Sequence, residues 1–318
     1  MPETEEKGLN KEVLASMGEK FKTAQTQTAD AFKARTVDDS TDVEAFLGLA
    51  ETNVLIYIFG YSSRAETIPT AQTAVQRAAT LDPSSAEVSR LSAILSFLGW
   101  DWKDSAESFL EAIQRDPRNL SARHWYSLYL VAMGRFDEAM AQSDELTKLD
   151  SEEDYLVGRG SLLYFQHRFA ELKALMHKTI AKDASVPWGY DWLGMAYDGL
   201  EEHDDAIRTY NTAFELSDGT AEVGAGLGHA LGLAGETDLA RQISDYYASI
   251  AQDHYVPPVQ RAYIHIGIGE YDEAIRLLEQ AFAENSWFLC FMKVEPWLDP
   301  IRNDGRFTDI ARRMEFPE

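Results

Sequence analysis

The sequence predicts an all-α fold, a solenoid of about seven helix-turn-helix repeats with a capping segment at each end. Three observations predict it: a small residue recurs at an almost constant spacing, glycine recurs at the expected turns, and Asp-Pro pairs close two of the units. A single helical hairpin of this length cannot bury its apolar face alone, so neighbouring units must stack on one another.

The recurring small residue fixes the frame of the array. Its successive positions are 34, 34, 33, 34, 34 and 34 residues apart, and they are Ala71, Ser105, Ala139, Leu172, Ala206, Ala240 and Ala274. Two helices approach closely only where one of them presents a residue without bulk. We therefore expect each of these residues to lie where the second helix of a unit packs on the first.

The amino-terminal part divides into an extension and the first units. Residues 1–42 are polar, and a helical stretch over 17–34 predicts a half repeat that caps the array of seven repeats over 43–285. The first unit closes at Asp82-Pro83 and the second at Asp116-Pro117, because proline ends a helix.

The fourth unit departs most from the pattern. Leu172 stands in place of the small residue, and Phe169 is the aromatic residue at the turn. Gly160 occupies the small position of the facing helix, which offsets the bulk of the leucine. We expect this unit to be the softest point of the array.

The fifth unit carries the clearest motif, and that motif resembles the tetratricopeptide repeat. Its residues are Tyr190, Leu193, Gly194 and Tyr197 on the first helix, then Ala206, Tyr210 and Ala213 on the second. The resemblance covers roughly residues 43–318. It implies a right-handed superhelix in which the first helix of each pair lines a concave surface.

Residues 286–318 form a tail that is rich in aromatic residues. We expect this segment to cap the last helix pair with Trp287, Trp297 and Phe307, because their joint exposure would promote aggregation. Self-association of two chains through the same aromatic tail is a further expectation.

The tail motif also narrows the resemblance. The Pro-x-Leu-Asp-Pro-Ile-Arg-x-Asp-x-Arg-Phe segment over 296–307, together with Trp100-Asp101-Trp102, resembles the repeat region behind effector domains of bacterial regulators. In those relatives the effector is a winged-helix, nucleotide cyclase or protein kinase domain. This sequence shows no such domain before the array, so the resemblance implies a sensing or scaffolding array that acts on a separately encoded partner.

Composition argues against two classes of partner. The chain has 29 Lys and Arg residues against 53 Asp and Glu, a formal charge of −24, so nucleic acid and anionic membranes would repel it. The first residues lack the pattern of a secretory signal, and no apolar run approaches the ~20 residues of a membrane-spanning helix. The single cysteine, Cys290, has apolar neighbours and is expected to be buried. We expect a cytoplasmic protein.

The resemblance also supplies candidate binding positions on the concave surface of the first helices. They are Arg90, Phe97, His124, Leu128, Tyr164, Trp188, Asp191, Met195, Asp198, His229 and Tyr263. This set is apolar and aromatic with a few acids, and it lacks the basic cluster with which chaperone-binding relatives hold a carboxylate terminus. We expect it to bind an apolar segment of a protein partner, with basic flanks that suit the acidic chain.

Two other interpretations of these residues stay open. The aromatic side chains could pack between units and contact no ligand. Alternatively, the superhelix could close around a small molecule, as a binding protein or an enzyme, at Tyr164, Trp188, Asp191 and His229.

The histidines do not predict a catalytic or metal site. His124 and His229 belong to different units, and no histidine pair has the close helical spacing of a metal-binding motif. His203 and His265 stand at packing positions of their units. We expect no catalytic residue, no metal and no cofactor, and a protein that binds and does not catalyse.

Overall fold

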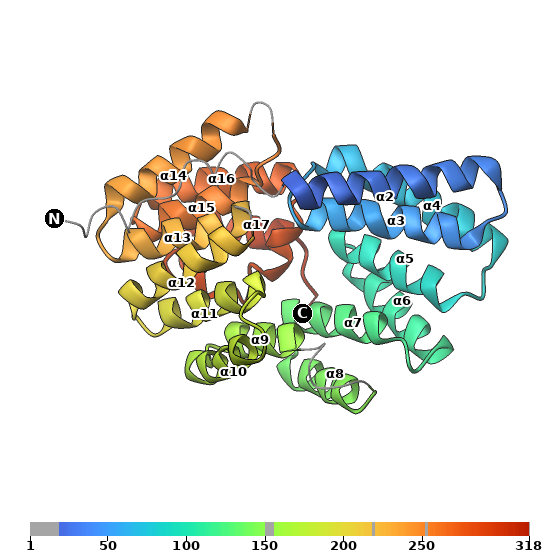
Figure 1. Cartoon of the computed structure of the whole chain (residues 1–318), viewed down its shortest axis with the longest axis horizontal. Coiled ribbons are helices and arrows are strands. Elements are labelled where there is room, and N and C mark those ends of the chain that lie inside the picture. Colours follow the sequence, from blue (N-terminus) through green and yellow to red (C-terminus); the bar gives the residue numbers. More distant parts are fainter. Residues whose placement is uncertain (1–18, 150–155, 218–219, 252–253, 318) are drawn as a thin grey trace. The chain divides into compact units, whose positions relative to one another are not determined.

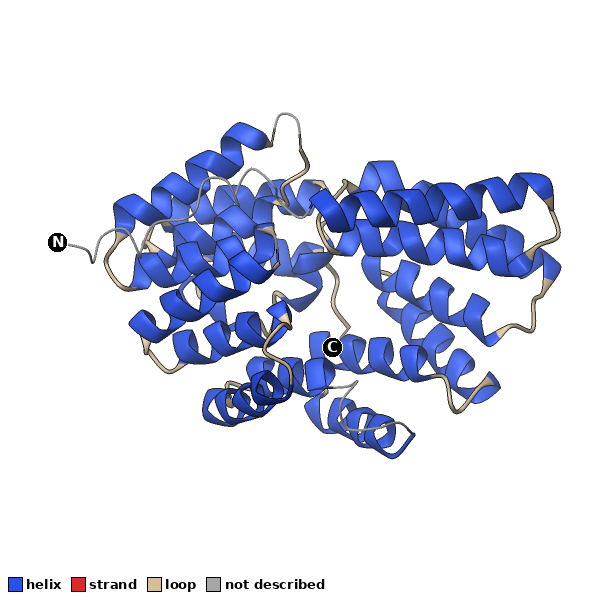
Figure 2. Ribbon diagram, in the orientation of Figure 1, coloured by secondary structure: helices blue, strands red, loops and turns tan. Residues whose placement is uncertain are grey.

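The computed structural model describes residues 19–149, 156–217, 220–251 and 254–317. Every regular element in these ranges is a helix (Figure 2). The predicted all-α repeat fold is confirmed. The first 18 residues of the predicted extension lie outside the described ranges, and so do residues 150–155, 218–219, 252–253 and 318.

In the described part of the chain, seven helical hairpins follow one another (Figure 1). They are α3 (Val43–Ile58) with α4 (Arg64–Leu81), α5 (Ala86–Leu98) with α6 (Trp102–Arg115), α7 (Leu120–Ala132) with α8 (Phe136–Leu149), α9 (Leu156–Phe165) with α10 (Phe169–Lys182), α11 (Pro187–Gly199) with α12 (His203–Leu216), α13 (Ala221–Leu233) with α14 (Thr237–Ile250), and α15 (Pro258–Gly267) with α16 (Tyr271–Ala283). Helix α2 (Glu19–Asp38) precedes them. The 3₁₀ helices η1 (Trp287–Phe291) and η2 (Pro296–Ile301) and helix α17 (Gly305–Arg313) follow.

The chain forms two compact units. Unit 1 contains the helices of Glu152–Ala283 together with Val294–Arg313, and unit 2 contains those of Lys20–Ser151 together with Glu284–Lys293 and Met314–Glu318. Hairpins four to seven therefore belong to unit 1, and hairpins one to three belong to unit 2. The predicted boundaries at residues 42 and 285 stay predictions.

The seven-position ladder lies where the sequence predicts it. All seven residues fall on the second helix of their hairpin, and every one of them has no exposed surface. In the fourth hairpin the Leu172 side chain faces Gly160, where an added methyl group would lie 3.5 Å from Leu172 Cδ1. The missing side chain of Gly160 thus makes the room that the leucine needs.

The turns between paired helices repeat with the same period. A residue with positive φ follows the first helix in each of the seven described hairpins: Gly60, Trp100, Gly134, His167, Glu201, Gly235 and Gly269. Three of the seven are not glycine, although a left-handed backbone costs other residues roughly 1–2 kcal/mol. The packing of the two helices therefore imposes this conformation whatever the residue.

The aromatic tail packs at two places. Part of it follows the expectation, because η2 contacts α15 and α17 contacts α16, which are the two helices of the last hairpin. The preceding segment, η1, instead packs against α5 and α7 within unit 2. There the Trp287 indole donates a hydrogen bond to the Ile58 carbonyl at 3.0 Å, and Cys290 is fully buried.

Candidate functional site

The first helices of unit 1 form one layer, which we call the first-helix layer. It consists of α9, α11, α13 and α15, and adjacent members contact each other. Seven predicted binding residues lie on this layer: Tyr164, Trp188, Asp191, Met195, Asp198, His229 and Tyr263. The other four lie in unit 2.

Trp297 of η2 covers one end of the first-helix layer. Its ring stacks on His229 with centroids 4.7 Å apart, meets Tyr263 edge-on at 5.0 Å, and meets Tyr164 edge-on at 6.5 Å. Three predicted site residues are thus brought together, and all of them are buried under a side chain of the same chain. At this end the layer binds its own tail.

A buried carboxyl group fixes the tail at this place. The Tyr164 hydroxyl donates a hydrogen bond to Glu295 Oε1, and the Trp297 backbone N–H donates to the same oxygen at 3.2 Å. Burial raises the pKa of Glu295 to about 7. Burial, followed by the neighbouring Glu295 carboxylate, also raises the pKa of Tyr164 well above its ordinary value, so the phenol remains a donor.

An imidazole and a carboxylate join α11 to α13 at the same end. His229 Nδ1 lies 2.8 Å from Asp198 Oδ2, and both residues are buried. The other oxygen of Asp198 lies 3.7 Å from Nδ1 of His203, which is too long for a hydrogen bond. The Asp198 carboxylate nevertheless raises the pKa of His203.

Tyr210 of α12 is wedged between α11 and α13. A methyl group added at Gly194 or at Gly226 would lie 2.6 Å from the Tyr210 ring, so the two glycines make the slot that this ring fills. Burial, followed by the negative charges of Asp198, Asp191, Glu295 and Glu222, raises the pKa of Tyr210 well above its ordinary value. The hydroxyl therefore stays protonated.

A second cross-helix pair stands two turns away from the first. Asp191 of α11 and Glu222 of α13 are 31 residues apart in the sequence, which is also the separation of Asp198 and His229. In this pair, however, both members are acids. Burial, followed by the charge of Glu222, raises the pKa of Asp191 well above its ordinary value.

The two acids differ in their access to solvent. Asp191 is 7% exposed, whereas the Glu222 side chain is exposed. The surrounding protein nevertheless desolvates the Glu222 carboxyl group and raises its pKa to about 7. Trp188, one turn before Asp191 on α11, is half-buried, and Met195 one turn after it is buried. This end of the layer offers the accessible part of the predicted site.

The four candidates in unit 2 have separate surroundings. The Arg90 guanidinium is buried, pairs with Glu51 at 3.0 Å and with Glu87 at 2.7 Å, and donates to the Ser121 hydroxyl at 3.2 Å. Its hydrogen-bonding groups thus join three successive first helices.

The remaining unit 2 candidates are apolar or neutral. Phe97 has no exposed surface and contacts Trp102, Tyr129 and Phe291. His124 and Leu128 are half-buried, and burial lowers the pKa of His124 to about 4, so that imidazole is neutral at neutral pH.

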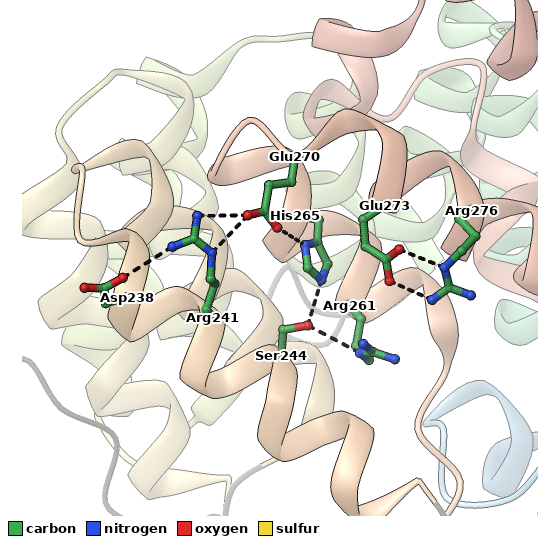
Figure 3. A network of polar contacts seen from close by, with 8 residues as sticks. All are labelled: Asp238, Arg241, Ser244, Arg261, His265, Glu270, Glu273 and Arg276. Carbon is green, nitrogen blue, oxygen red and sulfur yellow. Dashed lines mark hydrogen bonds and ion pairs between the residues drawn. The ribbon is translucent and has the colours of Figure 1, made fainter.

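A polar network around His265 resembles a catalytic triad in its order of groups (Figure 3). Ser244 Oγ lies 2.9 Å from His265 Nε2, and His265 Nδ1 lies 2.8 Å from Glu270 Oε2. A serine nucleophile is activated by an imidazole that a carboxylate orients in this way.

Burial gives the Ser244 network a structural role. Ser244 is 1% exposed and accepts a hydrogen bond from Arg261 Nε at 3.3 Å, so no substrate carbonyl reaches its hydroxyl in this structure. Glu270 also accepts from Arg241 of α14 at 2.9 Å (Figure 3). The network joins α14, α15 and the turn before α16, which agrees with the packing position predicted for His265.

The described residues contain neither a cluster of metal-binding side chains nor a helix that could span a membrane. Within those ranges, no group of three or more His, Cys, Asp and Glu side chains is placed to hold a metal ion. Among the same residues, no helix is both long enough and apolar enough to cross a membrane.

Sequence reasoning did not identify Glu222 on this layer, nor Tyr210 and Glu295 as polar groups beside it. It named Trp297 as a cap of the last helix pair but not as a contact of His229. One signal could have found Glu222: positions 31 residues apart face each other on neighbouring first helices, as Asp198 and His229 do. The place of Glu295 and Trp297 had no such signal, because the tail lies outside the repeat.

Known proteins share the repeat and the fold. The family model for the tetratricopeptide repeat matches residues 189–219, which cover all but the first two residues of the fifth hairpin. The search of curated proteins found no match. The crystal structure of yeast Tom70 aligns with a TM-score of 0.54 at 17% identity, over 92% of this chain and 62% of that chain.

A second solved structure gives the same result. The APC/C hetero-tetramer Cut9–Hcn1 aligns with a TM-score of 0.58 at 14% identity, over 95% of this chain and 53% of that chain. The chain thus spans less than two thirds of either protein, and the likeness at this identity concerns the fold. The family model therefore identifies one tetratricopeptide repeat, in the fifth hairpin, and the chain shares the helical-repeat fold of these two solved structures.

Proposed function

We propose that this protein is an interaction scaffold that binds a segment of a partner protein on the first-helix layer of unit 1. The site would lie at Trp188, Asp191 and Met195 of α11 and at Glu222 of α13. One observation carries the proposal: Trp297 covers the His229 end of this layer, whereas Trp188 and Glu222 at the other end keep accessible surface.

The chemistry of this end favours a segment with apolar and basic residues. The half-buried Trp188 offers apolar surface, and aromatic side chains are the residues that most often dominate binding energy at protein interfaces. Asp191 and Glu222 add negative charge to a chain whose net charge is −24, which would steer a basic segment toward the layer. A catalytic role has no comparable support, because the hydroxyl of the Ser244 network is buried.

The fold likeness supports the same class of function. Cut9 stands in a hetero-tetramer with Hcn1, so a chain with this architecture takes part in a protein assembly. A partner segment lying across first helices also suits the repeat geometry, because successive units present equivalent positions along one layer.

Affinity capture with Trp188→Ala as bait tests the proposal. Partners that the native protein retains should be lost or reduced at least about tenfold, since removing a well-packed aromatic anchor costs about 2 kcal/mol or more of binding energy. Tyr271→Ala is the matched control, because Tyr271 is an exposed aromatic residue on the second helix α16.

The circular dichroism spectra of both variants should equal that of the native protein. Equal capture by native protein and Trp188→Ala would refute the proposed face. Tyr164→Ala is unsuitable for this experiment, because Tyr164 is 2% exposed and bonded to Glu295, so its loss would also disturb the fold.

A further inference from the structure

A short segment of the tail lies between two anchored elements. We call residues 295–302, which contain η2, the strap. Before the strap, η1 packs within unit 2, where the Trp287 indole donates a hydrogen bond to the last carbonyl of α3 at 3.0 Å. After it, α17 packs on α16, and the Arg313 guanidinium lies over an aromatic ring of α16, 4.4 Å from its centre. Lys293 and Asn303, on either side of the strap, are exposed. The strap can therefore leave the first-helix layer while η1 and α17 stay in place.

Three apolar side chains and one carboxyl group hold the strap on the layer. Trp297, Leu298 and Ile301 are buried, and the Trp297 ring contacts three aromatic side chains of the layer as described above. The Glu295 side chain is 7% exposed, whereas Asp299, the other acid of the strap, is exposed. One of the few groups that seat the strap is thus an acid that titrates.

The hydrogen bonds to the Glu295 carboxyl group come from neutral donors. Both donors to its Oε1, the Tyr164 hydroxyl and the Trp297 backbone N–H, are uncharged. The cation of the strap is directed elsewhere, because Arg302 donates to the Glu295 backbone carbonyl at 2.8 Å and pairs with Asp299 at 2.7 Å. Burial of an ionised carboxylate costs free energy unless a cation pairs with it. Burial and ionisation of this group therefore oppose each other.

Other titratable and charged groups surround Glu295 on the helices and on the strap itself. They are Tyr164 of α9, Tyr210 of α12, His229 of α13 with its partner Asp198 of α11, Tyr263 of α15, and Arg302 and Asp299 of the strap, with His167 3.8 Å from Asp299. The pKa values of the three tyrosines are raised well above their ordinary value, mainly by burial, so these side chains stay neutral up to about pH 8. Burial is the largest influence on the pKa of Glu295 and outweighs the lowering by its hydrogen bonds and by Arg302.

We propose that the strap is a pH-sensitive latch, which is seated on the His229 end of the first-helix layer in acid and is released as the pH rises through neutrality. A released strap would uncover Tyr164, His229 and Tyr263 and would lengthen the accessible part of the layer. The latch itself follows from the contacts of the strap, and its role as a regulator of partner binding rests on the proposed function.

The direction of the switch follows from the proton that the seated strap holds. In the released strap Glu295 meets water and has its ordinary pKa of 4.5, whereas in the seated strap its pKa is about 7. Seating is therefore strongest in acid and weakens progressively between these two values. From about pH 5 to about pH 8 the equilibrium shifts on the order of 70-fold toward the released strap.

Hydrogen exchange of the full chain, followed by mass spectrometry at about pH 5 and about pH 8, measures the release. Two amides report the seated strap: the Trp297 N–H donates to Glu295 Oε1 at 3.2 Å, and the Leu298 N–H donates to the Glu295 carbonyl at 3.1 Å. The ratio of the intrinsic to the observed exchange rate is the protection factor, which removes the direct effect of pH on the exchange chemistry. Helix α13 is the internal reference, because it belongs to the same unit and stays folded when only the strap leaves.

Two variants assign the pH dependence to one carboxyl group. Glu295→Gln keeps the shape of the side chain and an acceptor for both hydrogen bonds, and it cannot ionise. Glu215→Gln is the matched control, because it removes one charge at an exposed acid of the same unit.

We expect the protection factor of the strap in the native chain to fall on the order of 70-fold between the two pH values. At about pH 8 it should lie at least about tenfold below that of α13, since release of the strap leaves the helices folded. Glu295→Gln should keep nearly the same strap protection at both pH values, whereas Glu215→Gln should behave as the native chain does.

Three results would overturn the latch. Equal protection of the strap and α13 at about pH 8 would show that the strap leaves only when the whole unit unfolds. Strap protection that does not depend on pH in the native chain would show that no titrating group holds it. An equal fall in Glu295→Gln would assign the pH dependence to another group.

The latch and the proposed function fail in different ways. Reduced partner capture by Trp188→Ala together with pH-independent exchange of the strap would refute the latch and leave the binding face standing. The expected exchange of the strap together with unchanged partner capture by Trp188→Ala would support the latch and refute the proposed face.

Discussion

Replacing Glu295 with glutamine should stabilise unit 1 at high pH and leave it unchanged at low pH. The Glu295 side chain is 7% exposed, and burial raises its pKa from 4.5 to about 7. Between these values the folded chain holds a proton that the unfolded chain has released. The free energy of unfolding therefore falls as the pH rises through this window, and the loss is complete above about pH 7.

The size of the effect follows from the same two pKa values. The rise from 4.5 to about 7 corresponds to a cost on the order of 3 kcal/mol for holding the ionised carboxylate in the folded chain. Glutamine carries no charge, and its amide oxygen can accept the bonds that Tyr164 and Trp297 donate to Glu295. Glu295→Gln should recover most of that free energy at about pH 8 and almost none at about pH 4.

Urea unfolding followed by circular dichroism at both pH values measures this difference. Taking the variant against the native protein at each pH removes the titration of every other group from the comparison. Glu215→Gln, at an exposed acid of the same unit, is the control and should show no such difference. An equal effect of Glu295→Gln at both pH values would refute the assignment of a raised pKa to this carboxyl group.

Three further predictions concern the packing of the repeat, and thermal unfolding checks each. Gly194→Ala should destabilise the protein by about 1–3 kcal/mol, since the new methyl group would lie 2.6 Å from the Tyr210 ring. Gly160→Ala should be neutral or stabilising, because the nearest neighbour of its new methyl group lies at 3.4 Å. Equal effects of the two variants would contradict the tight packing of Tyr210 between α11 and α13. Leu172→Ala should lower the free energy of unfolding by about 2–5 kcal/mol, because the leucine fills the space left by Gly160. This loss is expected although alanine is the usual residue of the ladder. An unchanged midpoint of thermal unfolding would show that the surrounding side chains close the space. Glu201→Gly should stabilise the protein by about 1 kcal/mol, because glycine adopts the φ of +61° at this turn without strain. A lower midpoint of thermal unfolding would contradict backbone strain at Glu201.

The likeness of Ser244, His265 and Glu270 to a catalytic triad shows why burial must be weighed together with distance. The distances between their polar atoms, 2.9 and 2.8 Å, are those of an activated serine. A nucleophile must also reach a substrate, and a side chain that is 1% exposed does not. The same bonds join three helical segments, which is a sufficient reason for them.

The amino-acid sequence by itself determined the repeat. The ladder from Ala71 to Ala274 predicted seven hairpins and the contact position of each, because close packing of two helices demands a small residue at a fixed place and leaves a period in the sequence. It also predicted that Gly160 would make room for Leu172, since the two residues face each other within one hairpin.

Only the tertiary structure decided what lies on the first-helix layer. The tail has no period, so nothing in the sequence indicated that Trp297 would reach His229 and Tyr263, or that η1 would pack within unit 2. The contrast between the Asp198–His229 and Asp191–Glu222 pairs likewise needed the register of two neighbouring helices. Local pattern predicts which residues meet inside a hairpin, whereas contacts between hairpins and with the tail depend on how the units stack and on which apolar surface the tail buries.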